Sequence, residues 1–218
     1  MIRAALLDID GTLIDSNNAH AQSWVEALEM HGIFVPFSQI RPLIGMGGDR
    51  LLPMVSQIEE DSPEGKAISN DRKKIFREKY LPNLTPFPEV RELLLRIRDE
   101  GVRLFVATSS GEDLLKDLLE KAEVADLVEG STTKDDAENS KPAPDIVEAA
   151  LGMSGVKPEE AVMIGDTPYD LEAASRAGVR CVAFECGGWS QKDLEGAAAV
   201  YKDASDLLRN FPTSPLKH

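Results

Sequence analysis

Short apolar runs alternate with amphipathic stretches over most of the chain. The runs at residues 2–9, 102–107, 161–165 and 181–184 have few polar positions, which is typical of strands buried on both faces of a sheet. The stretches between them place apolar residues at helical spacing. Strands that alternate with helices indicate an α/β fold with a covered parallel sheet. Weaker strands are expected at 127–129 and 198–201, and helices at 89–100, 113–122, 143–151, 168–177 and 204–211.

Residues 16–84 interrupt this alternation, because their pattern is helical throughout and shows no clear strand. The insert follows the first strand directly, and ligands of open α/β sheets bind at the carboxyl ends of the strands. We therefore expect a Rossmann-like α/β core, 1–15 and 85–218, with an inserted all-helical cap domain, 16–84, that acts as a lid over the carboxyl ends of the strands. A helical subdomain that only enlarges the core is the alternative. The expected helices of the insert are 18–31, 48–59 and 69–80.

Composition narrows the range of partners. The 218 residues include 24 basic and 38 acidic side chains, a formal charge of −14, which repels nucleic acid and anionic membranes. No apolar run approaches the roughly 18 residues of a membrane span, and Met1 leads straight into a strand rather than a signal peptide. We expect a cytoplasmic protein with no evident obligate protein partner. Cys181 and Cys186 fit no metal-ligand pattern and are expected to be reduced.

Two carboxylates follow the first apolar run. Asp8 and Asp10 stand at alternate positions, so both side chains can point toward one reaction centre, and Gly11 permits a sharp turn after them. Two like charges this close are costly unless a cation or a shared proton offsets them. The segment therefore predicts a functional site.

Two further polar segments follow later in the chain. Thr108 and Ser109 end the run at 102–107 with hydroxyls, which together with backbone N–H groups could bind a phosphate oxygen. An ordinary helix cap is the alternative for these hydroxyls. Lys141 lies in a loop stiffened by two prolines, where a fixed ammonium could offset carboxylate repulsion and bind a phosphoryl group.

Another acid stands at the end of the strand predicted at 161–165. Asp166 is followed by Thr167 as a candidate N-cap and Pro168 at the first helical position. Asp170 then falls in the first helical turn, where a carboxylate interacts favourably with the helix dipole, so capping alone could account for it. Several acids at strand ends together with one lysine suit Mg²⁺, a hard cation that binds a few carboxylates, waters and substrate phosphate.

These residues suggest a phosphoryl-transfer mechanism on a small phosphorylated substrate. Asp8 would attack phosphorus and form an aspartyl-phosphate. Asp10 would protonate the leaving alcohol and then deprotonate the hydrolytic water. Asp166 would complete the metal shell, and Thr108 with Lys141 would hold the phosphoryl oxygens.

The same residues resemble the four motifs of the haloacid dehalogenase superfamily, in order along the chain. The motifs are the segment 8–16, Thr108, Lys141 with Pro142, and the segment 165–170. The resemblance implies a Rossmann-like core, a helical cap of the C1 type, Mg²⁺ dependence and an aspartyl-phosphate.

It also implies a set of metal ligands. Asp8 and Asp166 would bind the metal through their carboxylates, and Asp10 through its backbone carbonyl. Asp170 would either bind the metal or support a ligand.

Within this superfamily several activities can be compared with the sequence. Dehalogenases lack the second acid of the first motif, and Asp10 is present here. Phosphonate cleavage uses a cap lysine, and residues 17–49 contain none. An inactive binding protein would be expected to lack an acid or the lysine, and none is missing. We therefore favour a phosphatase similar to the phosphoglycolate phosphatase branch.

A phosphosugar mutase resembling β-phosphoglucomutase stays open as the alternative. His20 matches a histidine position of that enzyme, although it is otherwise an ordinary first-turn histidine of a helix. The mutase carries an arginine in the loop that corresponds to 45–50, where Arg50 stands one or two positions later. His20 and Arg50 are therefore candidate substrate-binding residues of the cap.

Overall fold

The computed structural model describes residues 1–217, which divide into two compact units. The sheet unit consists of Met1–Asp15 together with the rest of the chain from Thr85. The helical unit is the continuous segment Ser16–Leu84. The chain thus leaves the sheet unit after its first strand and returns to it before the second.

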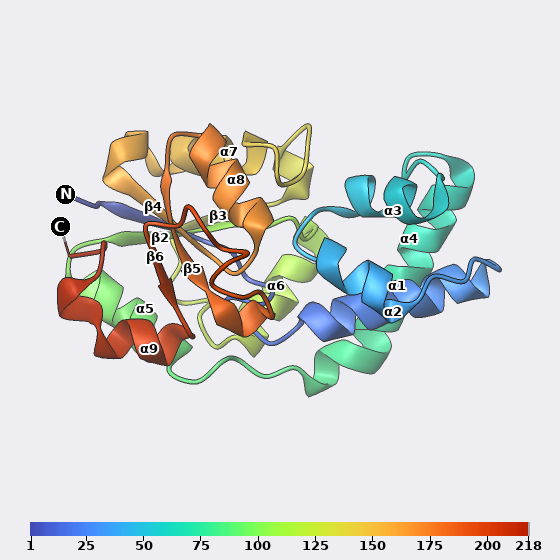
Figure 1. Cartoon of the computed structure of the whole chain (residues 1–218), viewed down its shortest axis with the longest axis horizontal. Coiled ribbons are helices and arrows are strands. Elements are labelled where there is room, and N and C mark those ends of the chain that lie inside the picture. Colours follow the sequence, from blue (N-terminus) through green and yellow to red (C-terminus); the bar gives the residue numbers. More distant parts are fainter. Residues whose placement is uncertain (218) are drawn as a thin grey trace. The chain divides into compact units, whose positions relative to one another are not determined.

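The sheet unit is built on six parallel strands in the order β3-β2-β1-β4-β5-β6 (Figure 1). This is the doubly wound order of a Rossmann-like fold, with the first strand in the middle of the sheet. The α/β parallel-sheet prediction is therefore confirmed. The strands are β1 (Ala4–Leu7), β2 (Arg103–Ala107), β3 (Gly130–Thr132), β4 (Ala161–Gly165), β5 (Arg180–Phe184) and β6 (Ala199–Tyr201).

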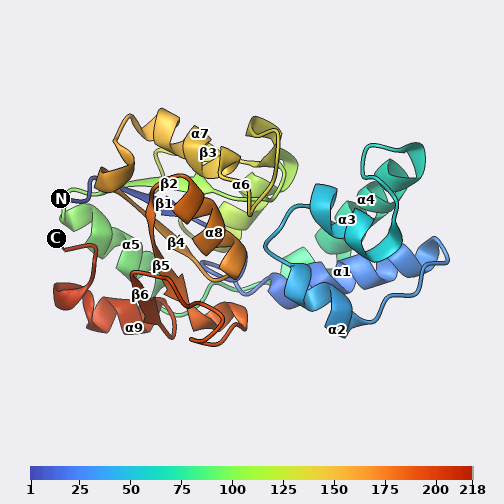
Figure 2. The ribbon, with the colours of Figure 1, turned by 45° about the horizontal axis from the view of Figure 1, so that its top comes forward.

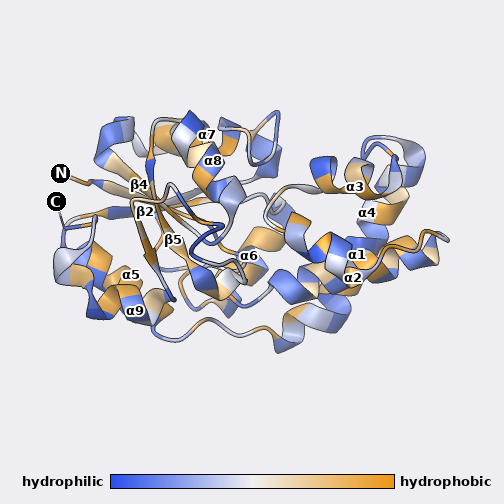
Figure 3. Ribbon diagram, viewed as in Figure 1, coloured by the Kyte–Doolittle hydropathy of each residue, from blue (hydrophilic) through white to orange (hydrophobic). Residues whose placement is uncertain are grey.

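Helices cover both faces of this sheet. In Figure 2, α7 and α8 lie on one side of the strands, and α5 and α9 lie on the other. Side chains of β1 alternate accordingly, and Ala4 and Leu6 pack into the cluster formed with Ile146 and Ala150 of α7. Figure 3 shows the strands as mostly hydrophobic, as expected for strands with no solvent-facing side. The helices are α5 (Val90–Asp99), α6 (Glu112–Lys121), α7 (Asp145–Ser154), α8 (Pro168–Arg176) and α9 (Ala204–Arg209).

The helical unit has its own apolar core. The structure describes all of its residues, and none of them forms a β-strand. Trp24 and Leu28 of α1 pack in this core with Leu51 and Leu52 of α3 and Ile68 of α4. The all-helical insert is confirmed. Its elements are α1 (Asn17–Met30), α2 (Phe37–Ile40), α3 (Gly48–Ser56), α4 (Pro63–Ile75), a π-helical turn (Phe76–Tyr80) and two 3-10 turns (Arg41–Leu43 and Leu81–Asn83).

Two predicted elements are displaced. The strand expected at 127–129 forms at Gly130–Thr132, because backbone pairing with Phe105 to Ala107 outweighs the apolar pattern of the preceding turn. The helix expected at 69–80 begins at Pro63, because Ser62 caps it: the Ser62 hydroxyl accepts a hydrogen bond from the Gly65 N–H at 3.0 Å. Proline is favoured at the first helical position.

Among residues 1–217, no helix has both the length and the apolar character needed to cross a membrane. The cytoplasmic location stays a prediction.

Candidate active site

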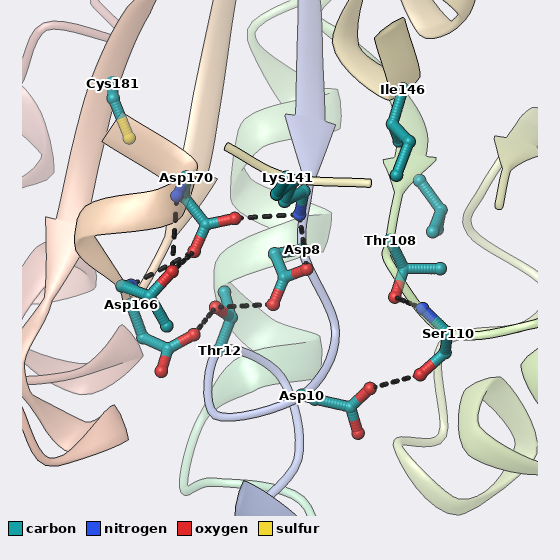
Figure 4. A network of polar contacts seen from close by, with 12 residues as sticks. Asp8, Asp10, Thr12, Thr108, Ser110, Lys141, Ile146, Asp166, Asp170 and Cys181 are labelled. Atoms are coloured by element: carbon teal, nitrogen blue, oxygen red, sulfur yellow. Dashed lines mark hydrogen bonds and ion pairs between the residues drawn. The ribbon is translucent and has the colours of Figure 1, made fainter. Parts of the chain in front are cut away.

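The site lies beyond the carboxyl end of β1, at the centre of the sheet (Figure 4). The backbone N–H of Asp8 donates to the Ile164 carbonyl at 2.9 Å, which continues the pairing of β1 with β4 past Leu7. Asp8 is nearly buried, and its Oδ1 accepts a hydrogen bond from Lys141 Nζ at 2.6 Å. The first acid of the sequence motif and the predicted lysine are thus in direct contact.

Lys141 bridges two carboxylates. Its Nζ also donates to Asp170 Oδ1 at 2.7 Å, and its side chain is fully buried. Burial alone would lower the pKa of Lys141, but the adjacent carboxylates of Asp170 and Asp8 outweigh burial and raise the pKa above its ordinary value. The ammonium is therefore charged, and it is the positive charge that the acid cluster requires.

The negative charge of Asp8 is disfavoured by its surroundings. Burial raises its pKa from 3.8 to about 7, with Lys141 opposing the shift and the charges of Asp170 and Asp10 adding to it. One lysine does not fully offset this many acids. The electrostatics therefore favour a further cation at this position.

Asp166 is held by a hydroxyl from the first motif. Thr12 Oγ1 donates to Asp166 Oδ1 at 2.9 Å and lies 3.5 Å from Asp8 Oδ2. A hydroxyl has a single proton, so the short contact to Asp166 is the real hydrogen bond. On the other side, a Cβ at Gly187 would lie 1.7 Å from Asp166 Oδ2, so only glycine fits there. The Asp166 carboxylate is confined between Thr12 and Gly187.

Asp170 both caps a helix and belongs to the site. Its Oδ2 accepts from the Thr167 N–H at 3.0 Å and from the Thr167 hydroxyl at 2.7 Å, a reciprocal capping box that begins α8. Its Oδ1 accepts from Lys141. Because both carboxyl oxygens already have protein donors, the arrangement favours Asp170 as the residue that orients Lys141.

A metal ion could be held by this group. Asp8, Asp166 and Asp170 each offer one oxygen, and these oxygens lie within 4.8 Å of one another. Three buried carboxylates are a donor set that fits Mg²⁺, which binds oxygen ligands. Among the described residues, the Asp10 side chain is not part of this group, and its Oδ2 accepts from Ser110 Oγ at 2.7 Å instead.

The hydroxyls predicted at the end of β2 lie at the same edge of the sheet. Thr108 is buried, and its Oγ1 accepts from the Ser110 N–H at 3.1 Å, which leaves the hydroxyl proton available for donation. Ser109 Oγ is buried without a hydrogen-bond partner in the part of the chain that the structure describes. A buried polar atom without a partner is uncommon and points to a ligand or water.

With this geometry in view, comparison with known proteins identifies the family. A model of haloacid dehalogenase-like hydrolases matches residues 5–184. The chain belongs to this family of hydrolases. Its enzyme class, predicted from the motifs, is thereby confirmed.

Relatives of this haloacid dehalogenase-like hydrolase include proteins named as phosphatases. A provisionally named pyrophosphatase PpaX from Caldanaerobacter subterraneus subsp. tengcongensis is 34% identical over 89% of this chain and 85% of its own. A phosphoglycolate phosphatase from Aquifex aeolicus is 32% identical over 95% of this chain and 96% of its own. A solved structure from Bacteroides vulgatus, provisionally named a beta-phosphoglucomutase, has a TM-score of 0.88 at 28% identity, covering 100% of this chain and 91% of that one.

The two predicted substrate-binding residues of the insert lie in the helical unit. His20 is buried in α1, its ring stacks on Phe76 at 4.0 Å, and its Nδ1 contacts the guanidinium of Arg72. Since arginine only donates, His20 accepts at Nδ1 and carries its proton on Nε2. Arg50 lies in the first turn of α3, and its Nε is buried without a hydrogen-bond partner among the described residues. Their roles in substrate binding stay predictions.

Three residues of the site were not selected from the sequence. Thr12 and Ser110 each hold a carboxylate of the site, and Gly187 leaves space for one. Thr12 stands two positions after Asp10, and Ser110 continues the run of hydroxyl residues that starts at Thr108. Their closeness in sequence to residues already selected could have identified both. Gly187 lies outside every motif and carries no such signal.

The cysteines play a structural part. Both are free: Cys181 is buried in β5, and the Cys186 thiol donates to the Gly11 carbonyl at 3.3 Å. Burial raises the pKa of both thiols, which disfavours the thiolate form that acts as a nucleophile. Neither belongs to the acid cluster.

Proposed function

We propose that this hydrolase is a Mg²⁺-dependent phosphatase that cleaves a small phosphorylated metabolite through an aspartyl-phosphate on Asp8. The observation that carries the proposal is the buried Lys141 ammonium, which lies between Asp8 and Asp170 within a cluster of three carboxylates. A structural ion pair would need one acid, whereas this arrangement gathers more acids than one lysine neutralises. The relatives named as phosphatases support the same activity.

In this proposal the carboxylates of Asp8 and Asp166 would hold Mg²⁺, and the resemblance to the haloacid dehalogenase motifs adds the backbone carbonyl of Asp10. When bound, the cation neutralises negative charge on the transferring phosphoryl group and on the acids around it. Asp170 keeps Lys141 in place, because both of its oxygens are already engaged.

The residues divide the reaction between them. The Asp8 carboxylate attacks phosphorus, the ester P–O bond breaks, and Asp10 gives its proton to the leaving alcohol. Asp10 then takes a proton from water, whose oxygen attacks phosphorus and displaces the Asp8 carboxylate as inorganic phosphate forms. Thr108, Ser109 and Lys141 bind the non-bridging oxygens.

The substrate would be a small phosphorylated acid similar to phosphoglycolate, or a sugar phosphate, and the relative named as a phosphoglycolate phosphatase supports the first of these. Arg50 and His20 of the helical unit are the residues we assign to its recognition. An arginine whose Nε has no partner among the described residues is suited to an anionic group.

A phosphosugar mutase is the second candidate, favoured by the similarity to the structure from Bacteroides vulgatus and by His20. A mutase returns the phosphoryl group to sugar rather than to water. Incubation with β-glucose 1-phosphate and a trace of the bisphosphate separates the two activities. Free phosphate indicates the phosphatase, and glucose 6-phosphate indicates the mutase.

The experiment that tests the proposal measures hydrolysis of p-nitrophenyl phosphate with Mg²⁺ and with EDTA. Activity should require the metal and disappear in Asp8→Asn, because an amide cannot act as the nucleophile. Acid quench during turnover, followed by mass spectrometry, should show one added phosphoryl group on the peptide that contains Asp8. Activity of Asp8→Asn above background would refute the assignment of the nucleophile.

A further inference from the structure

The carboxylate of Asp10 is oriented by a contact outside the metal cluster. Its Oδ2 accepts a hydrogen bond from Ser110 Oγ at 2.7 Å, between residues that are 100 positions apart (Figure 4). Asp10 itself is 8% exposed and Ser110 is half-buried, so this contact is partly shielded from water. A short hydrogen bond from a hydroxyl to a shielded carboxylate fixes the plane of that carboxylate.

Ser110 is itself fixed in the loop after β2. Its N–H donates to Thr108 Oγ1 at 3.1 Å, and its carbonyl accepts from the Lys134 N–H at 3.3 Å. Leu7 of β1 is paired with Val106 of β2, so Asp10 and Ser110 lie three and four residues beyond one paired position. The sheet register therefore brings the serine hydroxyl to the acid.

We propose that Ser110 is a positioning residue, whose hydroxyl holds the Asp10 carboxylate in the orientation for proton transfer to the leaving oxygen and from water. The proposal rests on the role proposed for Asp10 and extends it to a residue outside the four motifs. Misplacement of a reacting group by about 1 Å costs on the order of a hundredfold in rate, so such a contact can control activity.

The proton balance is compatible with a hydroxyl partner. As the ester P–O bond breaks, the Asp10 proton passes to the leaving oxygen, and the resulting carboxylate accepts from Ser110. In the second step the carboxylate takes one proton from water. A hydroxyl can donate or accept, so the Ser110 contact can persist in both protonation states of Asp10.

The test compares Ser110→Ala with the wild-type enzyme on two phosphate esters. The phenolate of p-nitrophenyl phosphate leaves without protonation, whereas the alkoxide of glycerol phosphate needs the Asp10 proton. We expect kcat/KM of Ser110→Ala to fall by roughly tenfold to a hundredfold for the alkyl ester and to change little for the aryl ester. This loss is part of the rate enhancement that general acid catalysis typically provides. The parameter kcat/KM covers only the steps up to release of the alcohol, so water attack does not enter it.

Two further variants separate positioning from folding. Ser110→Thr keeps the hydroxyl and should retain activity on the alkyl ester. Ser190→Ala removes another serine-to-aspartate hydrogen bond, from an exposed loop to Asp193, and should leave both activities unchanged. Equal losses on the two esters in Ser110→Ala, no loss on either, or a threonine variant as defective as the alanine variant would each overturn the proposal.

Asp10→Asn distinguishes this inference from the proposed function. If Asp10→Asn loses the alkyl ester selectively and Ser110→Ala does not, only the role of Ser110 is wrong. If Asp10→Asn shows no selective loss, the acid–base assignment itself is wrong, and the inference is overturned with it.

Discussion

Replacement of Lys141 by methionine isolates the ammonium that the acids surround. Methionine has a similar length and can occupy the buried position, but it removes the charge from contacts of 2.6 Å with Asp8 and 2.7 Å with Asp170. Removal of one partner from a buried ion pair typically costs about 3–5 kcal/mol, because the remaining charge has no counter-charge. For a chain of this length each kcal/mol lowers Tm by about 2–4 °C, so we expect a loss of roughly 6–20 °C.

The pH dependence of this loss has a defined sign. The pKa of Asp8 is about 7 in the folded protein, whereas the unfolded chain has the ordinary value of 3.8. Above about pH 4 the charged carboxylate of Asp8 therefore destabilises the folded state. Without Lys141, which lowers this pKa, the shift becomes larger. Acidification from pH 7 to pH 5 protonates Asp8, and it should therefore restore part of the stability of Lys141→Met.

Thermal unfolding followed by circular dichroism in EDTA measures the effect. Lys217→Met is the matched control, since Lys217 Nζ contacts both oxygens of Glu100 at 2.8 Å but lies at the surface. A surface pair contributes at most about 1 kcal/mol, so this control should unfold within a few degrees of the wild type. Equal Tm values for Lys141→Met and wild type at pH 7 would refute the account of the cluster, and so would a variant that loses stability on acidification.

Three more predictions follow from the same cluster. Thr12→Val removes a contact to a metal ligand, so the Mg²⁺ concentration for half-maximal activity should rise by roughly 10–100-fold. Thr12→Ser keeps the hydroxyl and should need the same Mg²⁺ concentration as the wild type. A titration of activity against Mg²⁺ measures both. Gly187→Ala should raise this Mg²⁺ concentration at least as much, because its Cβ would lie 1.7 Å from Asp166 Oδ2. Gly152→Ala is the control in the same titration, because a Cβ there would meet no atom within 4 Å. The metal-free wild type should become more stable as pH falls from 7 toward 4, by at most roughly 4 kcal/mol for a shift of the Asp8 pKa from 3.8 to about 7; denaturant unfolding in EDTA that shows no gain would contradict this.

The sequence was most informative where local pattern and chemistry coincide. The apolar run before Asp8 predicted a buried strand, and the structure has β1 at Ala4–Leu7 in the middle of a parallel sheet. Asp8, Lys141 and Asp170, chosen separately for their surroundings in sequence, are within direct hydrogen-bond contact. The end of a parallel strand predicted a site at Asp8, whereas Lys141 and Asp170 were joined to it by the resemblance to the four motifs.

Contacts between distant residues were not predictable in the same way. Ser110 looked like any residue of a hydroxyl-rich turn, and its partner Asp10 stands 100 positions earlier. Gly187 matters only because Asp166 lies against its backbone, and no local pattern encodes that approach. For Asp170 the sequence offered helix capping or a place in the site as alternatives. In the structure Oδ2 accepts the capping hydrogen bond from Thr167, and Oδ1 accepts from Lys141. The catalytic roles themselves stay predictions until activity is measured.

The insertion point of the helical unit has a consequence for synthesis of the protein. β1 leaves the ribosome before its neighbours β2 and β4, which begin at Arg103 and Ala161, and the contact of Lys141 with Asp8 spans 133 residues. The continuous segment Ser16–Leu84 can fold as a nascent domain long before those partners emerge. Chains halted before Lys141 should therefore gain helix without any hydrolytic activity, so that phosphate release by a growing chain would report that the segment from Lys141 to Asp170 has joined Asp8.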